Sequence, residues 1–281
     1  MLENVIVAIQ GQPGSYHDVA RKRYFDNGHE LLCRDTFAAV FSDVASGQAD
    51  YGLVAIENSL YGSINDVYDL LLKHRLWIGG EVYTTIHHCL LGTDADIDIA
   101  DIQTVHSHAL AFAQCEDYLT DQLPQAQRSV EADTAGSAAL VARHANPHVC
   151  AIASREAAAL HDLVIVAADI ESNPHNYTRF IVLQRHPHTE EQADKTSIIL
   201  RTDHKPGSLY KALGAFYDHN INLAKLESRP IVGTVWDYQF YLDFEAGLHK
   251  PRVEQTLDQL RSTGCEIIEL GTYIAGNNNG D

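Results

Sequence analysis

Short apolar runs alternate with helical patterns over the first 186 residues, and this alternation constrains the fold more than any other feature of the chain. The strand-like runs are 5–9, 51–56, 149–153 and 163–168. Helical patterns begin at Tyr16 and at Phe37, which follows Thr36 or Asp35 as a candidate N-cap, and another covers 112–119. Strands that alternate with helices predict an α/β domain with a largely parallel sheet.

A polar stretch at 187–194 lacks apolar periodicity and is predicted to be a linker. After it the order becomes strand, helix, two strands, helix and strand, the βαββαβ order of a ferredoxin-like module. The strand-like runs there are 197–200, 223–231, 235–244 and 265–270. We therefore expect one domain at 1–186, a linker at 187–194 and a second domain at 195–281.

The charge balance argues against two classes of partner. The 281 residues include 20 Lys and Arg against 38 Asp and Glu, which gives a net charge of -18. Nucleic-acid binding and a polybasic grip on anionic membranes both need the opposite sign, so neither partner is expected. The acidity also fits adaptation to salt.

The remaining composition predicts a cytoplasmic protein. No run of about 18 apolar residues is present, and the N-terminus lacks the basic and apolar regions of a signal peptide. The 5 cysteines are odd in number and widely spaced, which is typical of free thiols in a reducing compartment. The 16 histidines form pairs at i,i+1 and i,i+2 rather than the i,i+4 spacing of a helical metal site, so no metal is expected.

Three polar motifs could carry chemistry. Residues 11–15 form a glycine-containing turn between a strand and a helix, which offers backbone N–H groups to an anion or is an ordinary βα turn. Residues 57–59 follow an apolar strand, where α/β sheets place ligands, although a polar turn with a helix cap is equally open. Arg179 begins an apolar strand, and burying it would require a carboxylate, either of a ligand or of the protein.

In their joint order and spacing, the motifs resemble those of prephenate dehydratase in its monofunctional form with a C-terminal ACT regulatory domain. The resemblance covers about residues 4–274. In the first domain it rests on Gly11-Gln12-Pro13-Gly14-Ser15-Tyr16, Ile56-Glu57-Asn58-Ser59 with Gly62 and Ser63, His88-Cys89-Leu90-Leu91-Gly92, His108 with Gln114-Cys115, Asp133-Thr134-Ala135-Gly136-Ser137-Ala138, Ala151-Ile152-Ala153-Ser154 and Asn176-Tyr177-Thr178-Arg179-Phe180. In the second domain it rests on Pro206-Gly207-Ser208-Leu209-Tyr210 and Glu227-Ser228-Arg229-Pro230.

The chain departs from the family pattern at three places. Gln12 stands between the first glycine and the proline, His17-Asp18 replaces a Ser/Thr-His pair, and Leu110 replaces the glutamine of a His-Pro-Gln segment. Leu110 cannot make the hydrogen bonds of a glutamine, so we expect the pocket to lack any contact that this glutamine makes in the family.

The resemblance implies a lyase that converts prephenate to phenylpyruvate in phenylalanine biosynthesis, with loss of CO2 and hydroxide and without a cofactor. It implies a catalytic domain of two lobes like a periplasmic binding protein, at about 1–80 plus 170–186 and at 81–169. The implied catalytic residues are Thr178 as donor to the leaving hydroxyl, Arg179 as carboxylate clamp and Phe180 as ring or pocket wall. The implied substrate-binding residues are Ser15, Glu57, Asn58, Ser59, Gln114, Thr134 and Ala135, and Glu57 is favoured as a partner of Arg179.

The second domain is implied to bind L-phenylalanine as an allosteric effector at a subunit interface, in a homodimer or homotetramer. The implied phenylalanine-binding residues are Gly207, Ser208, Leu209, Asn222, Leu223, Glu227 and Ser228. Two alternatives stay open: an arogenate dehydratase, which catalyses the same elimination on an amino acid, and a non-catalytic sensor of aromatic metabolites.

Overall fold

The computed structural model describes residues 5–25, 28–188, 190–231, 233–234 and 237–277. The chain divides into two compact units. The first consists of Met1–Leu70, Val82–Phe180 and Asn277–Asp281, and the second of Leu71–Glu81 and Ile181–Gly276. The predicted domain boundaries at 186 and 195 differ from these limits. They stay a prediction.

The N-terminal sheet has the strand order β2-β1-β3-β11-β5, and β4 pairs with β3. Its strands are β1 (Ile6–Gln10), β2 (Glu30–Arg34), β3 (Tyr51–Asn58), β4 (Gly62–Ser63), β5 (Trp77–Thr85) and β11 (Tyr177–Gln184). Its helices are α1 (Tyr16–Tyr24), α2 (Phe37–Ser46) and α3 (Asn65–His74). Strand β1 lies parallel to both β2 and β3, and α1 and α2 pack against β1 and β3.

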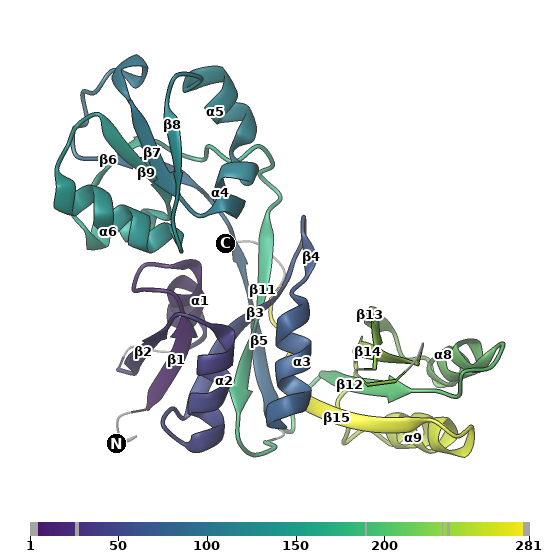
Figure 1. Cartoon of the computed structure of the whole chain (residues 1–281). Coiled ribbons are helices and arrows are strands. Elements are labelled where there is room, and N and C mark those ends of the chain that lie inside the picture. The colour runs from purple at the N-terminus through teal and green to yellow at the C-terminus, as the bar shows by residue number, and fades with distance from the viewer. Residues whose placement is uncertain (1–4, 26–27, 189, 232, 235–236, 278–281) are drawn as a thin grey trace. The chain divides into compact units, whose positions relative to one another are not determined.

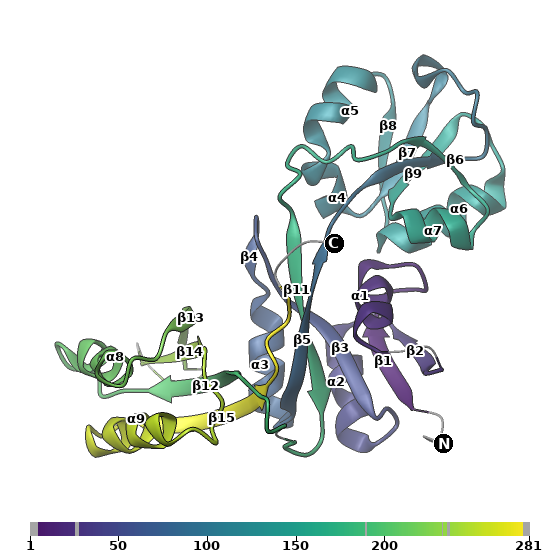
Figure 2. The same ribbon diagram turned by 180° about the vertical axis from the view of Figure 1, so that it is seen from behind.

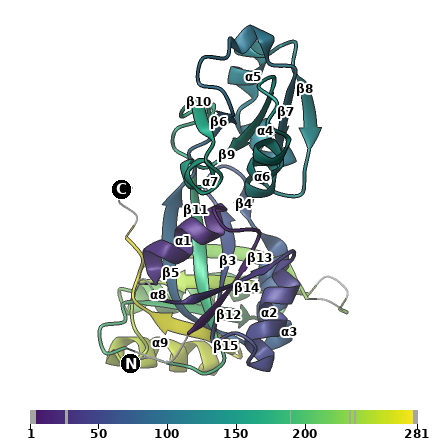
Figure 3. The ribbon, with the colours of Figure 1, turned by 90° about the vertical axis from the view of Figure 1, so that its left-hand side faces the viewer.

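The second sheet lies within the first unit and has the order β10-β6-β9-β7-β8, with β10 and β8 at opposite edges (Figure 3). Its strands are β6 (Cys89–Gly92), β7 (Thr104–Ser107), β8 (Gln127–Val130), β9 (Val149–Ala153) and β10 (Val164–Ala167). Its helices are η1 (Ile99–Asp101), α4 (Ala109–Gln114), α5 (Glu116–Gln122), α6 (Thr134–His144) and α7 (Arg155–Leu160). Strand β7 is parallel to β8 and β9, whereas β6 is antiparallel to β9 and β10, so this sheet is mixed rather than largely parallel.

Helices cover both faces of the second sheet, α4 and α5 on one side and α6 and α7 on the other (Figures 1 and 2). The sequence explains both layers, because successive strand residues point to opposite faces. Leu90 and Ile152 pack with the first helix pair, and Leu91 and Ala151 with the second.

Two short segments connect the sheets. Residues 86–88 lead from β5 into β6, and residues 168–176 lead from β10 into β11. They are hydrogen bonded to each other, from Ile86 N to Asn176 O at 2.7 Å and from Ile170 N to His88 O at 3.0 Å.

The C-terminal module has the predicted βαββαβ order. It consists of β12 (Lys195–Arg201), α8 (Ser208–Asp218), β13 (Leu223–Pro230), β14 (Tyr238–Phe244), α9 (Pro251–Ser262) and β15 (Glu266–Tyr273). The sheet order is β13-β14-β12-β15, and all three strand pairs are antiparallel. Both helices bury their apolar faces on one side of this sheet, as Phe216 and Leu260 illustrate. The predicted strand at 235–244 begins at Val235, which lies outside the described residues.

Most predicted elements of the first domain are present, with one helix divided. Thr36 caps α2, and its Oγ1 accepts the N–H of Ala39 at 3.2 Å. The predicted helix at 112–119 is instead α4 and α5, which meet at Cys115. Ser172 explains the break, because its N–H binds Gln114 O at 2.7 Å and its Oγ accepts the N–H of Asp117 at 3.1 Å.

No helix among the described residues is long and apolar enough to cross a membrane. All five cysteines are free thiols, and Cys89, Cys115 and Cys150 are buried.

Candidate active site

A cavity of about 440 Å³ lies in the first unit, between the two sheets. It is lined by Gln10, Gly11, Ser15, Tyr16, His17, Phe37, Ala55, Asn58, Ile64, Ile86, His88, His108, Leu110, Ala111, Gln114, Ala132, Asp133, Thr134, Thr178 and Phe180. This volume is typical of small-molecule sites, and the lining is mainly apolar with a few converging polar groups.

Two helices begin at the cavity wall. Ser15 caps α1, and Asp133 caps α6 with its Oδ1 accepting the N–H of Gly136 at 2.6 Å. The first N–H groups of a helix have no partner within the helix and carry a partial positive charge. No Lys or Arg is among the described residues that line the cavity. An anion bound there would therefore meet the N-terminus of α1 rather than a guanidinium, because the Asp133 carboxylate already caps α6.

The Asn58 amide is held in one orientation. Its Oδ1 accepts the backbone N–H groups of Leu60 and Tyr61 at 2.9 and 3.1 Å, which fixes the oxygen on that side. Its Nδ2 therefore points the other way and donates to Asn176 Oδ1 at 2.8 Å and to Thr178 Oγ1 at 3.0 Å. Asn58 and Thr178 are each only 8% exposed.

This orientation decides what the Thr178 hydroxyl can do. Because Thr178 Oγ1 accepts a hydrogen bond from Asn58, its own proton remains available for another acceptor. Thr178 lines the cavity, so a bound molecule can take that hydrogen bond.

The sequence of this chain matches one family of known proteins. The prephenate dehydratase family model matches residues 7–188. The chain belongs to the prephenate dehydratase family. Members of this family are enzymes.

The relatives extend the similarity beyond residue 188. Arogenate dehydratase 2 of Petunia hybrida is 38% identical over 283 residues, which cover 95% of this chain and 71% of the relative. The bifunctional chorismate mutase/prephenate dehydratase of Escherichia coli strain K12 is 36% identical over 277 residues, covering 96% of this chain and 71% of that protein.

Two solved structures are similar over almost the whole chain. One is described as GqqA, a novel type of quorum quenching acylase, with 34% identity, a TM-score of 0.85 and coverage of 96% of this chain and 98% of the other. The other is the prephenate dehydratase of Arthrobacter aurescens in complex with L-Phe, with 27% identity, a TM-score of 0.85 and coverage of 96% and 90%.

Within this family frame, the structure separates the predicted catalytic residues Thr178, Arg179 and Phe180. Thr178 and Phe180 line the cavity, but Arg179 does not. Alternation along β11 explains this, since neighbouring residues of a strand point to opposite faces. Arg179 is 5% exposed, and its Nη1 lies 3.8 Å from Glu57 Oε2. Arg179 therefore stands beside Glu57 and outside the cavity lining, and its role as a clamp on a substrate carboxylate stays a prediction.

The predicted substrate-binding residues also divide. Ser15, Asn58, Gln114 and Thr134 line the cavity, whereas Glu57, Ser59 and Ala135 do not. Ser59 instead joins β3 to β11, donating to His175 O at 3.0 Å and accepting from Tyr177 N at 2.9 Å.

A buried network of neutral side chains was missed by the sequence analysis. Tyr16 donates to His87 O at 2.6 Å and lies 3.0 Å from His88 Nδ1, while His88 Nε2 lies 2.7 Å from Gln114 Oε1. Burial raises the pKa of Tyr16 well above its usual range and lowers the pKa of His88, so both are neutral near pH 7. His88 belongs to a motif of the resemblance, but nothing in its local sequence indicates this contact with Gln114.

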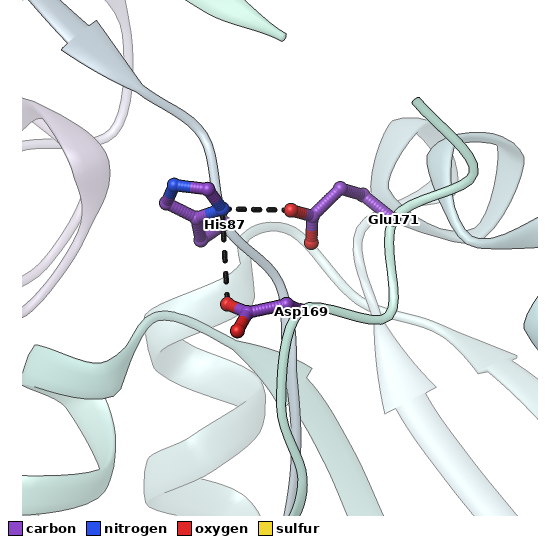
Figure 4. A group of neighbouring side chains, drawn as sticks. All are labelled: His87, Asp169 and Glu171. Atoms are coloured by element: carbon purple, nitrogen blue, oxygen red, sulfur yellow. Dashed lines mark hydrogen bonds and ion pairs between the residues drawn. The ribbon is translucent and has the colours of Figure 1, made fainter. Parts of the chain in front are cut away.

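The connecting segments contain one group whose ligand atoms are close enough to hold a metal: His87, Asp169 and Glu171 (Figure 4). Its carboxylates already have hydrogen-bond donors. Glu171 is bound by His87 Nδ1 at 2.7 Å and His88 N at 2.9 Å, and Asp169 by Arg155 Nη2 at 2.9 and 3.0 Å. The Arg155 cation beside Asp169 disfavours a second cation, so the group fits a structural tie between the segments better than a metal centre.

A second cavity of about 480 Å³ lies in the C-terminal module. Of the predicted phenylalanine-binding residues, Ser208, Leu209 and Ser228 line it, together with Tyr238 and Phe240. Gly207, Asn222, Leu223 and Glu227 do not line it. Gly207 has φ +82° at the start of α8, where a residue with a side chain would be strained, and Asn222 Nδ2 donates to Glu245 Oε2 at 2.9 Å.

Proposed function

We propose that this chain is a prephenate dehydratase, which converts prephenate to phenylpyruvate and is regulated by L-phenylalanine. The observation that carries the proposal is the Asn58–Thr178 hydrogen bond, which leaves the Thr178 proton free at the wall of a mainly apolar cavity. Prephenate and arogenate dehydratases among the relatives support the reaction class.

The reaction breaks two bonds of the substrate ring. The electron pair of the bond to the departing carboxylate enters the ring as CO2 leaves, and the C–O bond to the hydroxyl breaks at the opposite carbon. Thr178 transfers its O–H proton to the departing oxygen, which leaves as water, and a proton from solvent then restores the Thr178 hydroxyl. The ring becomes aromatic, which drives the elimination.

The other groups orient the substrate and exclude water. The N-terminus of α1 receives a carboxylate oxygen, and the Asn58 N–H stabilises the charge that develops on Thr178 Oγ1. Phe180 and Phe37 supply apolar walls for the ring, which strengthen each polar contact inside the cavity.

The regulatory half of the proposal rests on the second cavity. Its aromatic residues Tyr238 and Phe240 suit a phenyl ring, and the polar Ser208 and Ser228 suit an amino acid backbone. The Arthrobacter aurescens relative was solved with L-Phe, which supports this ligand. We also infer a homodimer or homotetramer in which β13, an edge strand of the module, contacts another chain.

Domain boundaries at 186 and 195 and a cytoplasmic location complete the proposal. The free thiols of all five cysteines support a reducing compartment.

The test measures phenylpyruvate formation from prephenate and phenylalanine formation from arogenate by the purified chain, with prephenate turnover repeated in the presence of L-phenylalanine. A higher kcat/KM for prephenate, changed by phenylalanine, is the expected result. A higher kcat/KM for arogenate would make the chain an arogenate dehydratase. Binding of prephenate without turnover of either substrate would make it a sensor. Acylase activity, which is named for GqqA, is assayed on the same preparation, and we expect none.

A further inference from the structure

His17 lies in the cavity wall and was noted in the sequence only as a departure from the family pattern. Its ring packs against Phe180 in an edge-on arrangement, with centroids 5.0 Å apart, and against Phe37 at 5.7 Å. These two contacts fix the ring plane, and a hydrogen bond to the backbone selects one of the two ring orientations within that plane.

One ring nitrogen is used by the backbone. The N–H of Ala55 donates to His17 Nε2 at 3.2 Å. The pairing of β3 with β1 ends at Leu53, so the Ala55 N–H lies beyond that ladder and takes the histidine as its acceptor. An accepting Nε2 carries no proton, and in a neutral imidazole the proton must therefore be on Nδ1.

The charge state agrees with this tautomer. Burial lowers the pKa of His17 to about 3, so the ring is neutral throughout the physiological range. Among the described residues, Ala55 is the hydrogen-bonding partner of His17, and Nδ1 is not one of the buried polar atoms that lack a partner. Because His17 lines the cavity, a bound molecule can accept a hydrogen bond from this Nδ1–H group.

We infer that His17 is a substrate-binding residue whose Nδ1–H donates a hydrogen bond to an oxygen of the pyruvyl side chain of prephenate. The position of His17 in the cavity wall is the reason for assigning it to the pyruvyl group. Thr178 and Phe180 are two residues apart on one face of β11, about 7 Å, and His17 packs on Phe180. With Thr178 at the departing hydroxyl, His17 lies on the far side of Phe180 from it. We place the pyruvyl group there because it is the longer of the two substituents on the carbon para to that hydroxyl. The assignment rests on the proposed function.

Two substitutions separate the bond to Ala55 from the bond to substrate. In His17→Gln, Oε1 is as many bonds from Cβ as Nε2 and can still accept the Ala55 N–H, but the Nδ1 donor is lost. In His17→Asn, Nδ2 is as many bonds from Cβ as Nδ1 and can still donate into the cavity, but the acceptor for Ala55 is lost. We expect a KM for prephenate about tenfold higher in His17→Gln than in His17→Asn, with similar kcat. The Tm should show the reverse order, lower in His17→Asn.

A spectroscopic measurement tests the same inference without turnover. In the 15N-histidine-labelled chain, the signal absent from His17→Gln identifies His17, which should be the neutral Nδ1–H tautomer from pH 5 to pH 8. Phenylpyruvate, which keeps the pyruvyl group, should move the Nδ1 proton downfield. A proton on Nε2, titration near pH 6.5, an unmoved Nδ1 proton or equal KM values in the two variants would overturn the inference. Failure of the proposed function would show differently, as absence of prephenate turnover by the unsubstituted chain.

Discussion

Asn58 Nδ2 donates a hydrogen bond to Thr178 Oγ1 at 3.0 Å, across 120 residues of sequence. Two backbone N–H groups hold the Asn58 oxygen on the opposite side, so the direction of this bond is set by the turn that ends β3. In this bond Thr178 accepts from Asn58, so its own O–H can donate toward the cavity. The proposed chemistry depends on this direction of the hydrogen bond.

Reversing the direction of the hydrogen bond between Asn58 and Thr178 should impair catalysis. In Asn58→Asp, a carboxylate oxygen would accept the Thr178 proton and remove it from the substrate. We expect kcat for prephenate to fall about 100-fold or more. Asn146→Asp, in an exposed turn, is the charge-matched control and should keep the original rate. An Asn58→Asp rate within a few-fold of the original would show that the direction of this bond is unimportant.

Gly14 should not tolerate a side chain. Its φ is +82°, and an added Cβ would lie 3.1 Å from Ala157 Cα. Gly14 O also accepts the Ser154 hydroxyl at 2.6 Å, which ties the turn before α1 to α7. Gly14→Ala should lower the free energy of unfolding by about 1–3 kcal/mol and raise KM, since the N-terminus of α1 would move.

Gly214 on α8 is the matched control, because its added Cβ meets no atom within 4 Å. Gly214→Ala should raise the free energy of unfolding by about 0.5–1 kcal/mol through helix propensity. Urea unfolding monitored by circular dichroism measures both variants, and equal shifts in the two would refute the close contact at Gly14.

Lys195 and Glu81 form a buried ion pair, and losing only one of the two charges should destabilise the fold. Lys195 Nζ lies 2.8 and 2.9 Å from the two Glu81 oxygens, with side chains 7% and 1% exposed. Lys195→Met removes the Lys195 ammonium from this buried carboxylate and should lower the free energy of unfolding by about 3–5 kcal/mol. The double variant Lys195→Met, Glu81→Met should recover more than half of that loss in urea unfolding. A double variant less stable than Lys195→Met would contradict this assignment.

Asp18 should contribute stability that depends on pH. Burial alone would raise its pKa, but the hydrogen bond from the Gly14 N–H and the cations Arg21 and Lys22 outweigh burial, so the pKa lies below its usual value. The stabilisation is therefore complete above the unfolded pKa of about 3.9 and is lost as pH falls through the folded pKa. Asp18→Asn should lower the free energy of unfolding by about 1.5–3 kcal/mol between pH 5 and pH 8.

The measurement is urea unfolding of both proteins across pH. The difference between them should stay constant above pH 5 and shrink below about pH 4. A difference that grows as the pH falls would mean that the folded pKa of Asp18 is raised instead.

The elements with strong local patterns could be predicted from the sequence. Thr36 and the apolar spacing after it placed α2, and the βαββαβ order placed the C-terminal module. The division of 112–119 into two helices could not be predicted, because it depends on Ser172, which lies far along the chain.

The sequence motifs predicted which segments form the site, but not which side chains contact one another there. The segments ending β3 and beginning β11 do meet, as Asn58 and Thr178 show. The opposite orientation of Arg179 follows from strand alternation, so the sequence contained a signal against placing Thr178 and Arg179 on one side. His17 gave no such signal, because its role depends on a backbone N–H 38 residues away.

The most direct test of the account is kcat for prephenate in Thr178→Val and Thr178→Ser. Valine keeps the shape of threonine without the hydroxyl, whereas serine keeps the hydroxyl beside Asn58. The account predicts that Thr178→Val loses at least about 100-fold in kcat and that Thr178→Ser keeps most of the original rate. A Thr178→Val rate close to that of Thr178→Ser would contradict the assignment of Thr178 as donor to the leaving hydroxyl.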